Sequence, residues 1–269
     1  MHILLTDVLT CPRCGPEFGL ILLAREVRDR RVLEGRLGCF NCREEYPVTG
    51  GFGDLRFPPA DSWGSGEPEG VEETDDPGKP EELGKPEELG KPEELGKPEE
   101  PGKVGEPESR PHPASSSRAV QLAALLGVTE GPALLLLQGA AASQAGAVAD
   151  LVDQVEVVAL DGRTLTQEER SGVSRMTARA TLPFYSDSLH GGLLSGRARK
   201  RELEEAIRVV RPGGRVVLLE AAEDSRAVME EKGLEILVEE KGVLVGQLPV
   251  SRDPPLVPLR GPDGNPTLP

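Results

Sequence analysis

The chain is short of aromatic residues and has no long hydrophobic run. Its 269 residues include one Trp, two Tyr and five Phe. No apolar run approaches the ~20 residues that a membrane-spanning helix needs. The first residues, MHILLTD, lack the charged start and the long apolar core of a signal peptide. We therefore expect a cytoplasmic protein that has no membrane partner.

Positive charge is also scarce, with 31 Lys and Arg against 46 Asp and Glu. Most of the excess negative charge lies in residues 58–114, which contain 17 acidic and 6 basic residues together with 12 prolines. Within them, residues 78–101 read GKPEEL GKPEEL GKPEEL GKPEEP. One Leu and one Pro per repeat bury too little to offset the entropy of ordering the backbone. We expect 58–114 to be a disordered linker, with recognition by the repeat as the alternative, and proline-rich 251–269 to be a disordered tail.

Two candidate globular parts remain, residues 1–57 and residues 115–250. The larger part has only Phe184 and Tyr185 as aromatics, which disfavours a stacking platform for single-stranded nucleic acid. The smaller part has balanced charge and no Lys, which disfavours a nucleic-acid-binding module there. The acidic isoelectric point therefore reflects the linker and says little about what the folded parts bind.

All four cysteines lie in residues 1–57, as two C-x-x-C pairs separated by 24 residues. The pairs are Cys11 with Cys14 and Cys39 with Cys42, and four thiolates at this spacing suit a tetrahedral Zn²⁺ site. A part this small is not secure on hydrophobic burial alone, so a metal has a physical purpose. Disulfides are disfavoured without a secretion signal, and a redox dithiol needs only one pair. We predict a structural zinc ion that leaves no position for a catalytic water.

The cysteines belong to a longer pattern in residues 1–57. Leu9 precedes the first pair, a strand is expected over 32–37 before the second, and Tyr46-Pro47-Val48 and Asp54-Leu55 follow. Over about 55 residues this pattern resembles the zinc-ribbon activator subunit shared by tRNA, rRNA and release-factor methyltransferases, in its short bacterial form. The resemblance implies an α+β zinc ribbon that has no catalytic activity and that binds and stabilises a methyltransferase.

Residues 115–250 alternate short apolar runs with helical stretches, which predicts an α/β doubly wound sheet. After the first strand we expect a Gly-Ala turn and a helix to about Leu151. The expected strands are 133–138, 155–160, 175–181, 189–194 and 215–220, with a helix over 197–210, a turn at 211–214 and a closing hairpin of 234–238 with 243–248.

Two segments of this part resemble class I S-adenosylmethionine-dependent methyltransferases. RELEEAIRVVRPGGRVVLLE (201–220) is similar to their helix-turn-strand unit, and LPFYSDSLHGGLLS (182–195) to their LPF-x-D segment. The resemblance implies a Rossmann-like domain that binds S-adenosylmethionine. It places Gly139 at the methionine end of the cofactor, Asp161 at the ribose hydroxyls and Leu182 beside the adenine.

The expected cofactor site departs from the family pattern. The turn QGAAAS keeps only Gly139, and apolar Leu136 or Leu137 replaces the acidic residue near the strand end. The aspartate of the fourth-strand segment falls on His190, which also fits a solvated histidine. Asp161 equally fits a turn before glycine, and Leu182 equally fits packing. The sequence names no catalytic residue.

Two hypotheses follow. The first is a methyltransferase-like protein whose zinc-ribbon activator is fused in cis and docks on its own chain. The alternative is a non-catalytic pseudo-methyltransferase scaffold that binds and stabilises a separate methyltransferase. The cluster Arg197, Arg199, Lys200 and Arg201 suits a phosphate-bearing substrate, RNA included, although a solvated helix face explains it as well.

Overall fold

The computed structural model describes residues 1–58, 113–179 and 181–250, apart from the side chains of 113–116 and 162. The expected linker, except its ends, and the expected tail therefore lie outside the described residues. The N-terminal elements are the 3-10 helix η1 (Ile3–Asp7) and the strands β1 (Thr10–Cys11), β2 (Gly15–Gly19), β3 (Ile21–Arg28), β4 (Arg31–Gly38), β5 (Glu45–Thr49) and β6 (Phe52–Leu55).

The C-terminal part begins with helix α1 (Pro113–Leu126), two residues earlier than expected. None of the helices among the described residues has the length and apolar character that a bilayer crossing needs. The other elements are β7 (Ala133–Gln138), η3 (Gly139–Gln144), α2 (Ala145–Ala149), β8 (Val155–Leu160), η4 (Gly162–Thr166), β9 (Val173–Ala178), β10 (Leu189–Leu194), α3 (Lys200–Val209), β11 (Val210–Leu218), α4 (Ser225–Glu231), β12 (Glu235–Glu240) and β13 (Val243–Gln247).

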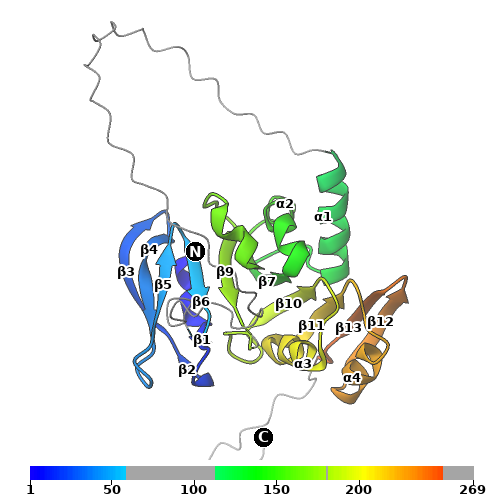
Figure 1. The fold of residues 1–269 in the computed structure, drawn as a ribbon. Coiled ribbons are helices and arrows are strands. Elements are labelled where there is room, and N and C mark those ends of the chain that lie inside the picture. The colour runs from blue at the N-terminus through cyan, green and yellow to red at the C-terminus, as the bar shows by residue number, and fades with distance from the viewer. Residues whose placement is uncertain (59–112, 180, 251–269) are drawn as a thin grey trace, which may run out of the picture. The chain divides into compact units, whose positions relative to one another are not determined.

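The C-terminal strands form a doubly wound sheet. Strands β9, β8, β7, β10 and β11 lie side by side and are all parallel. Strand β13 runs antiparallel beside β11, and β12 pairs with it at the edge. Helices α1 and α2 lie on one face of this sheet and α3 and α4 on the other (Figure 1). The structure confirms the predicted fold class, a zinc-ribbon-like N-terminal part followed by an α/β doubly wound domain.

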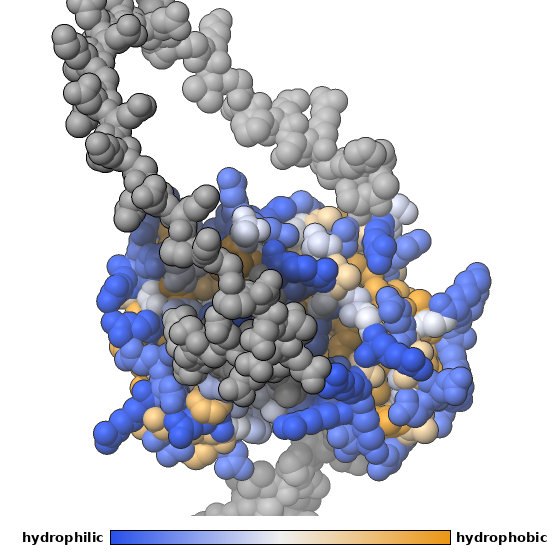
Figure 2. All heavy atoms as spheres, in the orientation of Figure 1, coloured by the Kyte–Doolittle hydropathy of each residue, from blue (hydrophilic) through white to orange (hydrophobic). Residues whose placement is uncertain are grey.

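The central strand β7 explains why ALLLLQ is apolar throughout. Successive side chains of a strand point to opposite faces, and both faces of β7 are covered. Leu135 and Leu137 pack in the cluster that contains α1 and α2, whereas Leu136 packs in the cluster that contains α3 and α4. Hydrophilic residues cover most of the face seen in Figure 2, and hydrophobic residues show only in patches between them.

The N-terminal strands continue this sheet. Strand β6 pairs in parallel with β9, with Gly53 opposite Met176 and Leu55 opposite Ala178. Strands β5, β4 and β3 follow in order, so that one sheet of 11 strands runs from β12 to β3. Buried Tyr46 and Leu55 share a single hydrophobic cluster with Met176. Residues that are far apart in the sequence therefore form one core.

A buried cluster of charged groups crosses the β6–β9 junction. The Arg31 guanidinium, with 8% of its side chain exposed, donates to both Glu156 oxygens at 2.7 and 2.9 Å and to Glu169 Oε1 at 2.7 Å. Arg175 pairs with Glu169 at 3.1 Å and donates to the Gly50 carbonyl at 2.6 Å. Burial works against ionisation of Glu169. Its hydrogen bonds with the Met1 ammonium and Arg31 outweigh burial and hold its pKa below the ordinary value.

Several boundaries differ from the expected ones. The segment after β7 is the 3-10 helix η3, whose Ala141 and Ala142 are buried, and α2 ends at Ala149 rather than at about Leu151. Strand β9 spans 173–178 rather than 175–181. Its residues 173–176 are the ones that pair with β8.

The helix expected over 197–210 is shorter, and the strand after it is longer. Helix α3 begins at Lys200, where the Arg199 N–H donates to Glu202 at 2.9 Å, and ends at Val209. The expected turn at 211–214 is an irregularity inside β11, since the pairing with β10 shifts between Leu189 and Gly191. Pro212 has no N–H to continue a helix, and Gly213 takes a φ of 81° that suits glycine.

Strand β3 was not predicted from the sequence. It forms a hairpin with β4 through the two-residue turn Asp29-Arg30, whose φ angles are 48° and 61°. Such turns usually contain glycine or asparagine, so the sequence signal was weak. Because β3 is an edge strand with exposed Ile21 and Leu23, its apolar pattern does not follow burial.

The buried cluster predicts the effect of removing its shared cation. Arg31→Ala leaves Glu156 and the pair of Glu169 with Arg175 without their bridging charge, and we expect it to lower the free energy of unfolding by about 3–5 kcal/mol. Arg28→Ala is the matched control, because Arg28 is exposed and pairs only with Glu26 among the described residues. It should change that free energy by less than about 0.5 kcal/mol. Denaturant unfolding of both variants measures the difference, and equal small losses would contradict the role of the cluster.

Candidate metal centre and cofactor site

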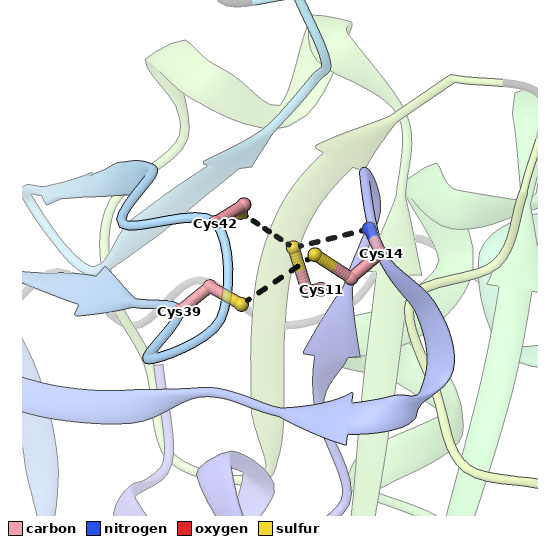
Figure 3. Close-up of side chains that lie close together, drawn as sticks. All are labelled: Cys11, Cys14, Cys39 and Cys42. Carbon is pink, nitrogen blue, oxygen red and sulfur yellow. Dashed lines mark hydrogen bonds between the residues drawn. The ribbon is translucent and has the colours of Figure 1, made fainter.

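The four cysteines meet in one cluster at the N-terminal part. Cys11 ends β1 and Cys14 precedes β2, whereas Cys39 follows β4 and Cys42 lies in the loop before β5. Figure 3 shows the four side chains converging from these two loops. The Cys14 N–H donates to Cys11 Sγ at 3.4 Å, so the backbone of the first turn already points at a sulfur.

The distances between the sulfurs fit a tetrahedral metal. Cys11 Sγ lies 3.6 Å from Cys42 Sγ, and Cys14 Sγ lies 3.8 Å from Cys39 Sγ. All four sulfurs are within 4.8 Å of one another. Zinc–sulfur bonds of ~2.3 Å at tetrahedral angles place sulfurs ~3.8 Å apart. The donor set and the spacing therefore suit a metal ion held by four thiolates.

The surroundings of the sulfurs favour one thiolate over the others. Burial opposes ionisation of Cys39, but the backbone N–H groups of Cys42 and Asn41 outweigh it and lower the pKa of the thiol to about 7. Burial, followed by the neighbouring cysteine sulfurs, raises the pKa of Cys42 to about 12. Without a cation, further thiolates repel one another, so a metal ion would supply the charge that makes all four ionise together.

The three residues expected at the cofactor all lie at the carboxyl edge of the sheet. Gly139 follows β7, Asp161 follows β8 and Leu182 comes four residues after β9. In open α/β sheets, ligands bind in the crevice outside this edge. All three residues thus follow strands at one edge of the sheet, and the contacts of each decide whether a ligand could use them.

Gly139 is a residue that this turn requires. Its φ is 71°, and a Cβ atom there would lie 2.6 Å from the Ser195 carbonyl oxygen. Ser195, which follows β10, also donates its hydroxyl to the Gln138 carbonyl at 2.7 Å and accepts the Ala141 N–H at 2.8 Å. A ligand at this turn would therefore find the Ala141 N–H already occupied. Ser195 directly follows an expected strand, but no motif in the sequence marks it as a functional residue.

Asp161 is occupied by a neighbour. Its Oδ1 accepts the Arg163 N–H at 2.9 Å, and its Oδ2 accepts from Arg163 Nε at 2.8 Å. Partial burial opposes ionisation, but these hydrogen bonds outweigh it and hold the pKa of Asp161 below its ordinary value. The Arg163 side chain is 75% exposed, so it can leave the carboxylate without breaking a packed core.

A pocket of about 320 Å³ lies at this edge, between the ends of β7 and β9 and helix α3. Leu182 lines it, whereas Gly139 and Asp161 do not. Gln138 also lines it, and the buried Gln138 Oε1 has no hydrogen-bond donor among the described residues. Buried acceptors without a donor are uncommon in folded proteins, so this oxygen marks the wall of the pocket at the end of β7. The remaining lining residues are Ala178, Arg179, Arg199, Glu202 and Glu205.

His190 and most of the basic cluster lie away from this pocket. His190 is the second residue of β10 and lies at the opposite edge, where its Nδ1 accepts the Leu134 N–H at 3.1 Å. It lines a separate hollow of about 740 Å³ at the amino ends of the strands. Of the basic cluster, Arg199 alone lines the carboxyl-edge pocket, and Lys200 pairs with Glu231 at 3.6 Å. The structure thus brings together only part of what the sequence suggested.

Comparisons with known proteins find similar structures but no similar sequence family. No family model and no curated protein matches the chain. A protein described as an S-adenosyl-L-methionine-dependent methyltransferase from Methanococcus maripaludis is similar, with 12% identity, 52% of this chain and 87% of that chain covered, and a TM-score of 0.42. The complex between the Haloferax volcanii Trm112 methyltransferase activator and a protein described as a methyltransferase is also similar. There the identity is 16%, 51% of this chain and 93% of that chain are covered, and the TM-score is 0.40.

A third similar structure is precorrin-6y C5,15-methyltransferase from Geobacter metallireducens, with 12% identity, 49% of this chain and 88% of that chain covered, and a TM-score of 0.39. At these scores, function has to be argued from the residues of this chain.

The cysteine cluster predicts one zinc ion per chain. Elemental analysis of protein purified under reducing conditions without chelator should give about one Zn²⁺, and Cys39→Ser should give far less, because three protein ligands leave the tetrahedron open. Phe40→Ala is the matched control, since Phe40 lies between the ligands and is 67% exposed. A metal content well below one in the unaltered protein would overturn the prediction.

Proposed function

We propose that this chain is an S-adenosylmethionine-dependent methyltransferase-like protein that carries its zinc-ribbon activator in cis. Residues 1–57 would be the activator and 115–250 the methyltransferase-like domain. The observation that carries the proposal is the pairing of β6 with β9. The ion pairs of Arg31 with Glu156 and Glu169 accompany this pairing. A strand that extends a sheet edge supplies main-chain hydrogen bonds to its partner and covers the edge.

In this proposal the metal is structural. Cys11, Cys14, Cys39 and Cys42 would hold one Zn²⁺ and leave no coordination position for a substrate. The ion would fix the two loops of the ribbon to each other, since each loop supplies two of the four sulfurs. The methyl acceptor would approach the carboxyl edge of the sheet, where β7 and β10 end.

The cofactor residues of the proposal are Gly139, Gln138, Asp161 and Leu182. When bound, S-adenosylmethionine supplies an electrophilic methyl group. Gly139 allows the backbone to approach the ligand, Gln138 Oε1 offers an acceptor to its ammonium group, and Leu182 offers an apolar wall. Asp161 would take the ribose hydroxyls after Arg163 has left its carboxylate.

The alternative is a non-catalytic scaffold that binds and stabilises a separate methyltransferase. Two contacts favour it: Ser195 uses the Ala141 N–H, and Arg163 uses both oxygens of Asp161. Each satisfies a group that the cofactor would otherwise need. A chain that fills its own site in this way would keep the fold without the reaction.

Opposite effects of two substitutions test the cofactor part of the proposal. Asp161→Ala should weaken S-adenosylmethionine binding by about tenfold or more, because it removes charge-assisted hydrogen bonds. Arg163→Ala should strengthen binding, because it frees the same carboxylate. Calorimetric titration of the full chain measures both. Absence of binding in the unaltered protein and in Arg163→Ala would favour the scaffold.

Cleavage between the two parts tests the activator part. A protease site placed between residues 59 and 112 allows the full chain to fold before it is cut. We expect both fragments to elute together after cleavage, since β6–β9 pairing and a buried charge cluster hold them. In Arg31→Ala the fragments should separate at low micromolar concentration, whereas Arg28→Ala should behave like the unaltered protein. Separation of the unaltered fragments would point to a ribbon that acts in trans.

A further inference from the structure

The segment Leu182–Tyr185 lies between helix α3 and the ribbon residues 8–10, which directly precede the metal ligand Cys11. On the ribbon side, the Thr10 N–H donates to the Pro183 carbonyl at 2.9 Å, and the Tyr185 N–H donates to the Val8 carbonyl at 3.0 Å. Leu9 forms an antiparallel bridge with Phe184, and both side chains are fully buried. The ribbon therefore holds this segment by its main chain.

On its other side the same segment is fixed to α3. The Leu182 N–H donates to Glu205 Oε2 at 3.0 Å. Arg208 donates to the Leu182 carbonyl at 2.9 Å and to the Phe184 carbonyl at 2.8 Å. Leu182 and Glu205 both line the carboxyl-edge pocket. The position of this segment thus sets one wall of the pocket.

The ribbon residues that contact Leu182–Tyr185 are next to a metal ligand. Thr10 directly precedes Cys11, and β1 consists of these two residues alone. Strand β1 pairs with β2 at Thr10 with Gly19 and Cys11 with Gly15. Because Cys11 ends this strand and supplies one of the four sulfurs, a metal held by the cluster would fix the chain directly after Thr10. Strands β4, β5 and β6 of the ribbon are instead joined to the large sheet by the pairing of β6 with β9 and by the ion pairs of Arg31.

We propose that the metal at the four cysteines positions the Leu182–Tyr185 wall of the carboxyl-edge pocket, through the backbone of Val8, Leu9 and Thr10. Loss of the metal releases this wall while β6 stays paired with β9. The ribbon thereby controls the pocket in addition to covering a sheet edge. The inference rests on the proposed metal and does not depend on which ligand the pocket binds.

Hydrogen exchange of the full chain tests the connection directly. When a high-affinity chelator removes zinc, we expect the Thr10, Leu182 and Tyr185 amides to exchange about tenfold faster or more, because the two segments that carry them become mobile. Amides of β7, β8 and β6 should keep their rates. Unchanged exchange at Leu182 and Tyr185 after zinc loss overturns the proposal. An equal increase in β7 and β8 also overturns it, because the metal would then stabilise the whole chain rather than this wall.

A second experiment moves the wall without touching the cysteines. A Cβ atom at Gly19 would lie 2.4 Å from the Tyr185 hydroxyl oxygen and 3.4 Å from Tyr185 Cζ. Gly19→Ala should therefore speed exchange at Tyr185 with zinc content unchanged, and adding Tyr185→Phe should restore the rate. Gly38→Ala is the matched control, because its nearest neighbour is 3.9 Å away. No effect of Gly19→Ala, or no rescue by Tyr185→Phe, contradicts the connection.

Binding of S-adenosylhomocysteine separates this inference from the proposed function. If the zinc-loaded chain binds it, zinc removal and Gly19→Ala should both weaken binding, and Gly38→Ala should not. Unchanged affinity after zinc loss overturns the proposal. If the loaded chain binds none, the cofactor proposal fails, and the exchange rates alone decide the connection between metal and wall.

Discussion

Arg31 is the residue on which the joining of the two parts depends. Its guanidinium lies between Glu156 and Glu169, and only 8% of its side chain is exposed. Moving charged groups out of water is costly unless they pair closely. The cluster therefore does little for stability compared with an apolar core, but it strongly disfavours any arrangement in which the charges are separated. The parallel register of β6 on β9 is the arrangement that satisfies it.

This junction joins only some of the ribbon's strands to the large sheet. Strands β4, β5 and β6 extend the large sheet and share its core through Tyr46 and Leu55. Strands β1 and β2 form a separate two-stranded sheet beside the sulfur cluster. The division matters for the proposed function, because residues 8–10, at the start of β1, contact the segment Leu182–Tyr185 that borders the carboxyl-edge pocket. A structural metal can act on a distant site without taking part in chemistry.

The carboxyl edge combines features of a working site and of a closed one. Gly139 keeps the left-handed backbone that the turn needs, and Gln138 Oε1 lacks a donor among the described residues. Ser195 and Arg163, however, satisfy groups that a cofactor would use. The Ser195 contacts bind the turn to β10 and are partly buried, whereas Arg163 is on the surface. The two obstacles to a ligand are therefore unequal, and the one at Asp161 costs less to remove.

Local chemistry was enough to predict several elements from the amino-acid sequence. Two C-x-x-C pairs specified the sulfur cluster, and the apolar run of β7 specified a strand buried on both faces. The sequence did not indicate the edge strand β3, whose side chains are exposed. It also did not show that Ser195 holds the turn at Gly139, because Ser195 is 54 residues from Ala141 in the chain. The joining of β6 to β9 is likewise a contact between distant segments. That pairing brings Arg31 to carboxylates 125 and 138 residues away, and no local pattern encodes a contact between charges so distant in the chain.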